Sequence, residues 1–546
     1  MKSNLPLLVL SLLPLACNPA NLGGETSCES GDPACESGDP NKLPPGGPGA
    51  YDKVGPTGNT PFDPTEDGSS GVKLDKDGNI VLDPKGFGST QSPILWVANS
   101  AEGTVSKIDT RTLTEVGRYF THPGGKADPS RTTVGLSGDV VVANRSASDA
   151  SRASAVRIAG DKSQCIDRNG NGKIDTSENA TPLGWAEGQP NNPTDECILW
   201  FTKLTPGSLP RAAGFNAGLG ETDTVVYVGL YSTREVVRLN AKTGAVMKTI
   251  SVTPAMPYGL VIDKNGDVWV RGAEGSLAVI QVNQGDQVKV YNGAKAPPCP
   301  YGIAADSAGR IYTAGGSCVS RFDPKTETWE KLDLQPQGMQ SGRGLAIDSK
   351  TGIWIADTST GLFHVDGAGA QMVYKGKTAN VSSNNVGAAV DFDNNPWVIS
   401  QANSAAYKVD PSNYSTKQVS VGSGPYTYSD MTGYQLRNAG APSGFWRHTF
   451  MGCMGASQTR WLELVYMLQA PAGTQVTIRV RSANDKTSLL SAPWTEMAKI
   501  PSDVSPVKLP GISGSLLQVE VGMKSSVRDV TPILSGLSAG YSCVFG

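Results

Sequence analysis

The chain has 546 residues, more than one ordinary hydrophobic core accommodates, so two or three domains are expected. Its 64 glycines and 37 prolines fit many turns between short strands. The net charge of −3, without any run of Lys or Arg, argues against a nucleic-acid partner. Only three histidines occur, His122, His364 and His448, which argues against a histidine-based metal centre.

The first 17 residues have the features of an export signal peptide. Lys2 supplies a positive charge, and Leu5 to Ala16 is an apolar run of 12 residues, too short to span a bilayer. The run ends in LPLAC, which resembles a bacterial lipobox but has Pro14 three positions before the cysteine. The resemblance implies a lipoprotein anchored to the membrane through lipid on Cys17, in the cell envelope and at the outer membrane if the cell is Gram-negative. An ordinary secretory signal with an unmodified cysteine is the alternative.

Residues 18–91 are rich in Gly, Pro, Ser, Asp and Glu, and contain the tandem heptads SCESGDP and ACESGDP. A segment of this composition cannot bury enough apolar surface to order itself, so we predict a flexible stalk. Near its end, residues 73–84 have the pattern of a hairpin.

Seven short segments then repeat the pattern of one β-strand: ILWVAN, VVVANR, VVYVGL, DVWVRG, RIYTAG, GIWIAD and NPWVIS. From Tyr227 onward the central aromatic residues are 42 or 43 residues apart. A period of about 40–50 residues built from short strands indicates a β-propeller with four strands per blade. We therefore predict seven blades over residues 92–438. The first unit lacks an inner strand, and residues 425–436 would supply it and close the ring.

An insertion at 164–197 in the second repeat contains DRNGNGKIDTSE, residues 167–178. It resembles the calcium loop of EF-hand and dockerin-like proteins, in which oxygen ligands alternate along the chain. The resemblance assigns a structural Ca²⁺ to Asp167, Asn169, Asn171, Lys173 (through its carbonyl), Asp175 and Glu178. Because the flanking helices of an EF-hand are missing, we expect a brace with a Kd of about 10⁻⁴–10⁻³ M rather than a sensor. The alternative is a turn that binds no metal.

The chain has nine cysteines, and eight remain after Cys17 is assigned to the lipid. We expect four disulfides between neighbours in sequence: Cys28–Cys35, Cys165–Cys197, Cys299–Cys318 and Cys453–Cys543. Disulfides require an oxidising compartment, in agreement with export.

Residues 443–546 depart from the repeat and alternate apolar and polar residues over three long segments. This pattern predicts an antiparallel β-sandwich, so the expected fold class is all-β, a seven-bladed β-propeller followed by a β-sandwich. Trp446, Trp461 and Trp494 would either fill its core or stack on sugar rings.

The blade sequence PYGLVIDKNGDVWV resembles the NHL repeat and the virginiamycin B lyase-like propellers. In that lyase family, histidines and glutamates at the channel mouth hold Mg²⁺ and abstract a proton. Here the equivalent positions are Tyr258, Tyr301, Arg343 and Val386, and none of the three histidines falls there. The sequence also lacks the common hydrolase and metalloprotease motifs.

We therefore predict a non-catalytic surface lipoprotein that binds a protein or glycan partner. Tyr258, Tyr301, Arg343 and Tyr426 are the candidate ligand contacts, because they begin inner strands near one mouth of the channel. Two alternatives stay open: a lyase or hydrolase with a non-histidine site, and a purely structural component of the envelope.

Overall fold

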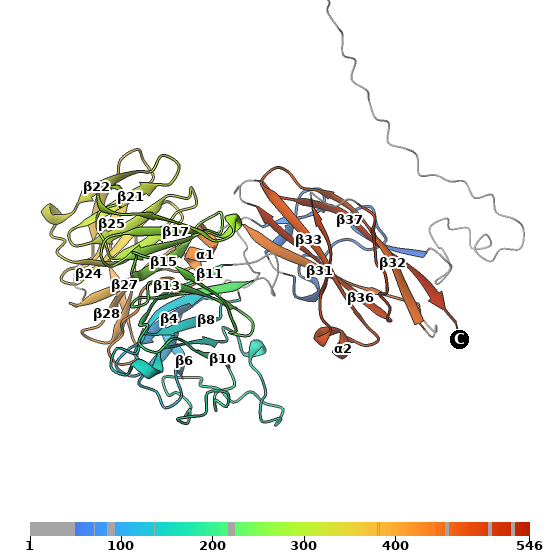
Figure 1. Cartoon of the computed structure of the whole chain (residues 1–546), viewed down its shortest axis with the longest axis horizontal. Coiled ribbons are helices and arrows are strands. Elements are labelled where there is room, and N and C mark those ends of the chain that lie inside the picture. Colours follow the sequence, from blue (N-terminus) through green and yellow to red (C-terminus); the bar gives the residue numbers. More distant parts are fainter. Residues whose placement is uncertain are drawn as a thin grey trace, which may run out of the picture.

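The computed structural model describes residues 50–69, 71–83, 93–135, 137–216, 224–378, 381, 383–439, 442–453, 458–500, 505–525 and 530–545. The chain forms two lobes of antiparallel β-sheet that lie side by side (Figure 1). None of its helices, within these ranges, is both long and apolar enough to cross a bilayer.

The larger lobe is a β-propeller made of seven small sheets in the described residues. Each of six sheets has four strands in a meander, and one has three. In chain order the strands are β4 (Ile94–Asn99), β5 (Thr104–Asp109), β6 (Thr114–Phe120); β7 (Pro129–Val134), β8 (Val140–Asn144), β9 (Ser154–Ile158), β10 (Ile198–Lys203); β11 (Pro210–Asn216), β12 (Val225–Leu230), β13 (Glu235–Asn240), β14 (Val246–Ser251); β15 (Pro257–Ile262), β16 (Val268–Gly272), β17 (Leu277–Gln281), β18 (Gln287–Tyr291); β19 (Gly302–Ala305), β20 (Ile311–Gly315), β21 (Cys318–Asp323), β22 (Thr328–Asp333); β23 (Gly342–Ile347), β24 (Gly352–Asp357), β25 (Gly361–Asp366), β26 (Val373–Lys377); β27 (Asn385–Val390), β28 (Pro396–Ser400), β29 (Ala405–Val409) and β30 (Thr416–Ser420). The predicted all-β propeller with seven blades is confirmed.

The repeat of the sequence reflects one hydrogen-bonding device. An aspartate in the turn after the inner strand accepts a hydrogen bond from the aromatic residue of the second strand. Trp269, Trp354 and Trp397 each donate from Nε1 to such an aspartate over 2.9 Å. These aspartates, Asp263, Asp348 and Asp391, also accept backbone N–H groups of their own turns. The turn and the blade core are therefore fixed together, which explains why an acidic turn and a buried aromatic residue recur at constant spacing.

The ring closes with strands from both ends of the propeller. The segment 425–431 runs beside β4, where Tyr426 N donates to Ala98 O over 3.0 Å and Trp96 N donates to Met431 O over 2.9 Å. The segment 425–431 thus takes the place of the inner strand of the first blade, as the sequence predicted, whereas residues 434–436, also expected in that strand, belong to a short helix. Closure covers the edge of β4 that would otherwise be open.

One end of the central channel is covered by the short helix α1 (Tyr434–Ala439). Its residues reach blades on different sides of the ring: Tyr434 donates to Asn394 Oδ1 over 2.8 Å, Leu436 packs with Phe215, and the helix contacts β19. Asp430 accepts the backbone N–H groups of Thr432, Gly433 and Leu436, and its burial raises the pKa of the carboxyl. The opposite end, where the inner strands begin, carries the side chains considered below.

The second lobe is a two-sheet unit built from residues 50–83 and 443–545. One sheet has the order β31-β36-β33-β34, and the other has the order β2-β3-β37-β32-β35 with β1 paired to β37. The bounds are β1 (Ala50–Val54), β2 (Val72–Leu74), β3 (Ile80–Leu82), β31 (Ser443–Met451), β32 (Gln458–Gln469), β33 (Thr474–Ala483), β34 (Thr495–Ile500), β35 (Val507–Lys508), β36 (Leu516–Ser525), β37 (Ile533–Val544) and helix α2 (Lys486–Ser491). Trp446 and Trp461 are buried in the core that both sheets share, whereas Trp494 packs on Arg447 and Arg481.

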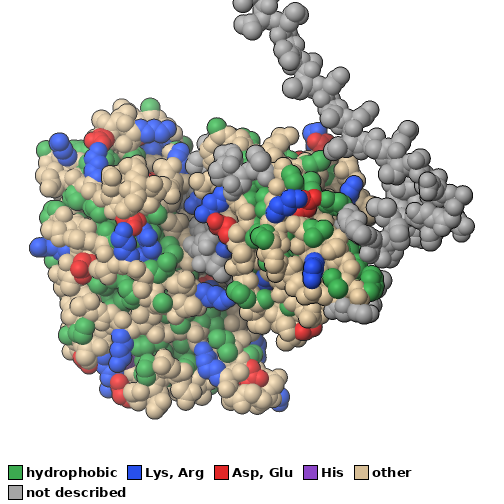
Figure 2. All heavy atoms as spheres, turned by 45° about the vertical axis from the view of Figure 1, so that its right-hand side comes forward, with side chains coloured by type: hydrophobic (Ala, Val, Ile, Leu, Met, Phe, Trp, Pro, Cys, Tyr) green, Lys and Arg blue, Asp and Glu red, His purple; other side chains and the backbone are tan. Residues whose placement is uncertain are grey.

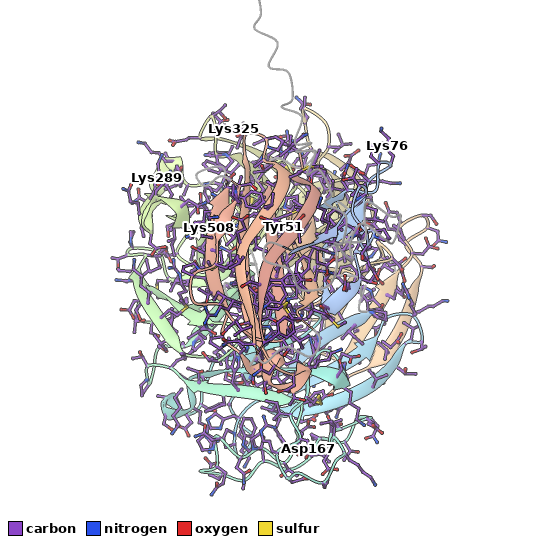
Figure 3. All side chains as sticks on the ribbon, turned by 90° about the vertical axis from the view of Figure 1, so that its right-hand side faces the viewer. Tyr51, Lys76, Asp167, Lys289, Lys325 and Lys508 are labelled. Carbon is purple, nitrogen blue, oxygen red and sulfur yellow. A yellow bond between two sulfur atoms is a disulfide. The ribbon has the colours of Figure 1, made fainter. Side chains whose placement is uncertain are left out.

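The prediction of a flexible stalk over 18–91 is wrong for residues 50–83. The expected hairpin forms as β2 and β3, and both β1 and β3 pair with β37, the last strand of the chain. Val54, Phe62, Ile80 and Leu82 are buried in the core of the unit. Figure 3 shows Tyr51 and Lys76 within this lobe. A few separate apolar residues, rather than a long apolar run, pack residues 50–83 into the core. Composition alone therefore did not show that this segment is folded. Residues 18–49 lie outside the described residues.

The two lobes meet at a buried charged contact. Lys524 of β36 lies against the turn between β15 and β16, which contains Asp263 and Asp267. Burial lowers the pKa of Lys524, while the two aspartates oppose that shift. Burial and then the charge of Asp263 raise the pKa of Asp267 to about 6.

Three of the four expected disulfides are present: Cys165–Cys197, Cys299–Cys318 and Cys453–Cys543. The first closes the base of the insertion, the second links two segments of the fifth blade, and the third joins the ends of the two-sheet unit. Cys17, Cys28 and Cys35 lie outside the described residues.

Candidate functional site

The inner strands share an irregularity at the end of the channel opposite α1. In five of them the pairing register skips a residue near the strand start, which is a β-bulge. A bulge turns a side chain out of the regular alternation and is common beside functional sites. The residues at these bulges are Ser130, Arg211, Tyr258, Arg343 and Val386.

A glycine near the start of several inner strands lets neighbouring strands approach closely. A Cβ atom on Gly302 would overlap the carbonyl oxygen of Arg343, and one on Gly387 would overlap that of Thr427. The Tyr-Gly and Arg-Gly pairs of the sequence therefore combine two requirements: close approach of neighbouring strands and a side chain at the channel mouth.

Four tyrosines from three blades meet at this mouth in one hydrogen-bonded network. The hydroxyl of Tyr258 lies 2.7 Å from that of Tyr301 and 2.9 Å from that of Tyr426. Tyr301 also lies 3.0 Å from the hydroxyl of Tyr428 and accepts a hydrogen bond of 2.6 Å from Arg343. The structure thus brings together all four residues that the sequence marked as ligand contacts.

Four arginines surround these rings, and each guanidinium carbon lies 4.2–5.9 Å from the centroid of at least one of the tyrosines. They are Arg131, Arg145, Arg211 and Arg343. Arg131 is fully buried and crosses to the carbonyl of Tyr258, to which Nε and Nη2 donate over 3.2 and 3.1 Å. Such cation–π contacts are strongest where both groups lose water. We call these eight side chains the tyrosine–arginine cluster.

The cluster carries more positive than negative charge. Arg145 pairs with Asp128 at 2.6 Å, and no carboxylate among the described residues pairs with Arg131, Arg211 or Arg343. Nε of Arg211 and Nε of Arg343 are buried without a hydrogen-bond partner, as are the hydroxyls of Ser130 and Ser208. Buried donors without partners are uncommon in folded proteins.

This charge changes the acidity of one phenol. Burial alone would raise the pKa of Tyr426, but the charge of Arg131 and hydrogen bonds from Tyr258, Tyr301 and Tyr428 lower it to about 7. Burial and the neighbouring phenols raise the pKa of Tyr301 and of Tyr428. Tyr426 therefore ionises more readily than Tyr301 and Tyr428.

Sequence reasoning missed Arg131, Arg145, Arg211 and Tyr428. A signal for Arg211 was present, because proline precedes the residue at the channel mouth in several repeats, as in Pro210-Arg211, Pro257-Tyr258, Pro300-Tyr301 and Pro425-Tyr426. Arg131, Arg145 and Tyr428 do not occupy the repeated position, and only the folded ring brings them to it.

The insertion of the second blade forms a compact loop at the edge of the propeller, where Figure 3 shows Asp167. The carboxylate of Asp167 accepts the N–H groups of Gly170 and Gly172 over 2.8 and 2.9 Å. Asn169 and Asn171 both donate from Nδ2 to Asp175 Oδ2, over 2.8 and 3.0 Å. Three of the expected calcium ligands, Asn169, Asn171 and Asp175, are thus in contact, and Asp167 holds the turn between them.

Glu178, the expected bidentate ligand, does not join them and instead pairs with Lys162 at 2.8 Å. The buried Glu196 accepts hydrogen bonds from the backbone N–H groups of Arg168, Asn169 and Asp175 and so fixes the loop to the base of the insertion. No group of three or more Asp, Glu, His or Cys side chains placed to hold a metal occurs in the described part of the chain. The loop has oxygen donors suited to Ca²⁺, and Glu178 would have to leave Lys162 to complete the set.

The three histidines have other surroundings. His122 is buried beside Pro123, His364 stacks on Trp354 at 4.0 Å, and His448 pairs with Glu66. None of them belongs to the tyrosine–arginine cluster.

Comparison with known proteins gives distant structural matches. No family model matches the chain, and no curated protein matches its sequence. A catalytically inactive virginiamycin B lyase from Staphylococcus aureus with quinupristin is similar at 14% identity, covering 54% of this chain and 84% of that one, with a TM-score of 0.37. A streptogramin B lyase structure matches at 14% identity, 64% and 94% coverage and a TM-score of 0.38. A functionally unknown protein from Desulfotomaculum acetoxidans matches at 9% identity, 62% and 99% coverage and a TM-score of 0.43.

Proposed function

We propose that this protein is a non-catalytic cell-surface lipoprotein whose propeller binds a protein or glycan partner at the tyrosine–arginine cluster. The observation that carries the proposal is the convergence of eight polar and aromatic side chains at one mouth of the channel, with buried donors that lack partners. Helix α1 covers the other end, so a ligand has one route to the cluster. Pockets that combine aromatic surface with a few unsatisfied polar groups are typical binding sites.

The test uses the full-length chain in detergent on a glycan array and on beads with envelope extract. We expect a partner whose retention falls at least tenfold when Tyr301→Phe and Arg343→Gln are combined. The matched control is Arg111→Gln, which removes a cation from an exposed ion pair with Asp393, in the turn between β27 and β28 at the α1 end of the propeller and so opposite the cluster. Binding that is equal in both variants would refute the cluster as the contact site. Turnover of a lactone or streptogramin substrate would instead establish the lyase or hydrolase alternative.

In the same proposal, the insertion binds Ca²⁺ as a structural brace. The ligands are Asp167, Asn169, Asn171, Asp175, the carbonyl of Lys173, and Glu178 once it has left Lys162. Support comes from the facing side chains of the loop and from its position, because Cys165 and Ile174 pack on a core shared by the first two blades. Metal held here would tie the insertion to both blades.

Calcium is tested by thermal unfolding after chelation. A ligand that binds only the folded state stabilises it by about 2.7 kcal/mol at 100 times its Kd, so Ca²⁺ is expected to raise the melting temperature. Asp167→Ala should abolish the rise, whereas Asp149→Ala, an exposed aspartate outside the loop, should retain it. The same rise in Asp167→Ala would place the metal elsewhere.

Anchoring through Cys17 completes the proposal. Its support is the lipobox-like sequence, and its test is metabolic labelling with a radioactive fatty acid. Cys17→Ser should remove the label and release the chain from the membrane fraction. A label that persists in Cys17→Ser would favour an ordinary secretory signal.

A further inference from the structure

The positive charge of three arginines in the tyrosine–arginine cluster is not balanced by carboxylates of the described residues. Arg131, Arg211 and Arg343 have no carboxylate partner among the described residues around the cluster, and Asp128 is already bound bidentately by Arg145. Arg131 is fully buried and is satisfied by backbone carbonyls, whereas Arg211 and Arg343 are half-buried, so part of each side chain stays accessible. Guanidinium groups prefer planar oxyanions, which accept two parallel hydrogen bonds.

The channel is blocked for a threading chain at the tyrosine–arginine cluster. Side chains from opposite sides of the ring touch across the channel, since Tyr258 belongs to β15, Arg343 to β23 and Tyr426 to the closing segment. Helix α1 closes the other end. A chain cannot thread through such a channel, so the group that enters is a terminal one.

Exposed apolar side chains of the propeller lie away from the tyrosine–arginine cluster. The most exposed large apolar side chains of the propeller, such as Val246, Met247, Trp329 and Val373, lie on outer strands, away from the mouth. Figure 2 has the second lobe in front and does not view the mouth; it shows hydrophobic side chains in small groups among charges of both signs. Protein interfaces gain most of their affinity from apolar and aromatic anchors in a dry centre. Tyrosine rings that carry a network of hydroxyls suit a sugar better, because they offer both a stacking face and hydrogen bonds.

We propose that the tyrosine–arginine cluster binds the terminal acidic sugar of a saccharide, with its oxyanion on Arg211 and Arg343 and its ring on the tyrosines. The proposal rests on the proposed function and names the ligand class of that same site. A carboxylate and a sulfate ester present the same oxyanion chemistry, and the two sources are separated by the probes below.

The test is calorimetric titration of the full-length chain in detergent with D-glucuronate, D-glucose 6-sulfate and D-glucose. We expect at least one acidic sugar to bind at least tenfold more tightly than glucose. Arg211→Gln and Arg343→Gln should each weaken that binding at least tenfold, while Arg111→Gln should leave it unchanged. Equal binding of glucose, or equal weakening in Arg111→Gln, would overturn the inference. A short peptide with a terminal aspartate that binds more tightly than both acidic sugars would overturn the sugar class.

A second measurement needs no variant of the arginines. An anion on the cluster lies near the Tyr426 hydroxyl, which Arg131, Tyr258, Tyr301 and Tyr428 surround. A bound anion should disfavour the phenolate and move the tyrosinate absorbance step of the wild-type protein to higher pH. An unchanged step at saturating acidic sugar would refute binding at this place.

The outcomes also separate the two proposals. If neutral glycans bind the array through the cluster, the proposed function stands and the acidic-sugar inference fails. If acidic sugars bind the cluster but retention of every array and envelope partner is independent of it, the inference stands and the proposed function fails.

Discussion

Replacement of Phe62 by alanine tests whether the N-terminal segment is part of a folded domain. The ring is 4% exposed, and its centroid lies 4.9 Å from that of Trp446 in an edge-to-face contact at 83°. Phe→Ala in a core costs about 3–5 kcal/mol, of which the aromatic pair contributes roughly 0.5–1.5 kcal/mol. Since a domain is stable by about 5–15 kcal/mol, Phe62→Ala should remove about a fifth or more of the stability of the two-sheet unit.

Pulse proteolysis in urea, with fragments identified by mass spectrometry, resolves this unit from the propeller. For a urea dependence of about 2 kcal/mol per M, the midpoint for fragments of 443–545 should fall by about 2 M. Leu74→Ala, at a position 39% exposed in the same segment, should change stability by less than about 0.5 kcal/mol. An unchanged midpoint in Phe62→Ala would mean that residues 50–83 are dispensable and would refute the two-part construction of the unit.

Three further predictions concern titration and core bonding. The absorbance of tyrosinate should show a step near pH 7 in the wild-type protein, and Tyr426→Phe should remove it, because the pKa of this phenol is lowered to about 7; a step retained in the variant would assign it elsewhere. The raised pKa of Asp267, about 6, means that the folded state holds this proton more tightly than the unfolded state, so stability should fall as pH rises from about 4 through 6. Thermal unfolding of Asp267→Asn should lack this part of the pH dependence, and an identical profile would contradict it. Trp354→Phe removes the indole donor to Asp348 and should cost about 1–3 kcal/mol in urea unfolding, whereas no loss would show that the bond contributes little.

The propeller was predictable because each blade repeats the same local chemistry. A turn aspartate, an aromatic residue and alternating apolar positions recur at nearly constant spacing, so seven weak signals reinforce one another. Tyr258, Tyr301 and Arg343 shared that advantage, because the repeat aligned them at the starts of inner strands.

Features without a repeat were harder to predict. Arg131 and Arg145 occupy ordinary-looking positions, and only the closed ring brings them to the tyrosines. Residues 50–83 have a composition close to that of a disordered linker, and their few apolar residues acquire meaning only against strands that lie more than 370 residues later in the chain. Non-local pairing of this kind leaves no periodic trace in a single sequence.

The two-part construction of the second lobe also sets an order of assembly. β1 and β3 pair with β37, the last strand to be made, so this sheet cannot form while the propeller is still being synthesised. At about 5–20 residues per second, the roughly 450 intervening residues take about 20–90 s. The apolar strand Ile80–Leu82 has no partner on β37 during that interval, whereas each propeller blade can pair its own neighbouring strands as it emerges. The propeller is thus expected to fold first, and the second lobe beside it last.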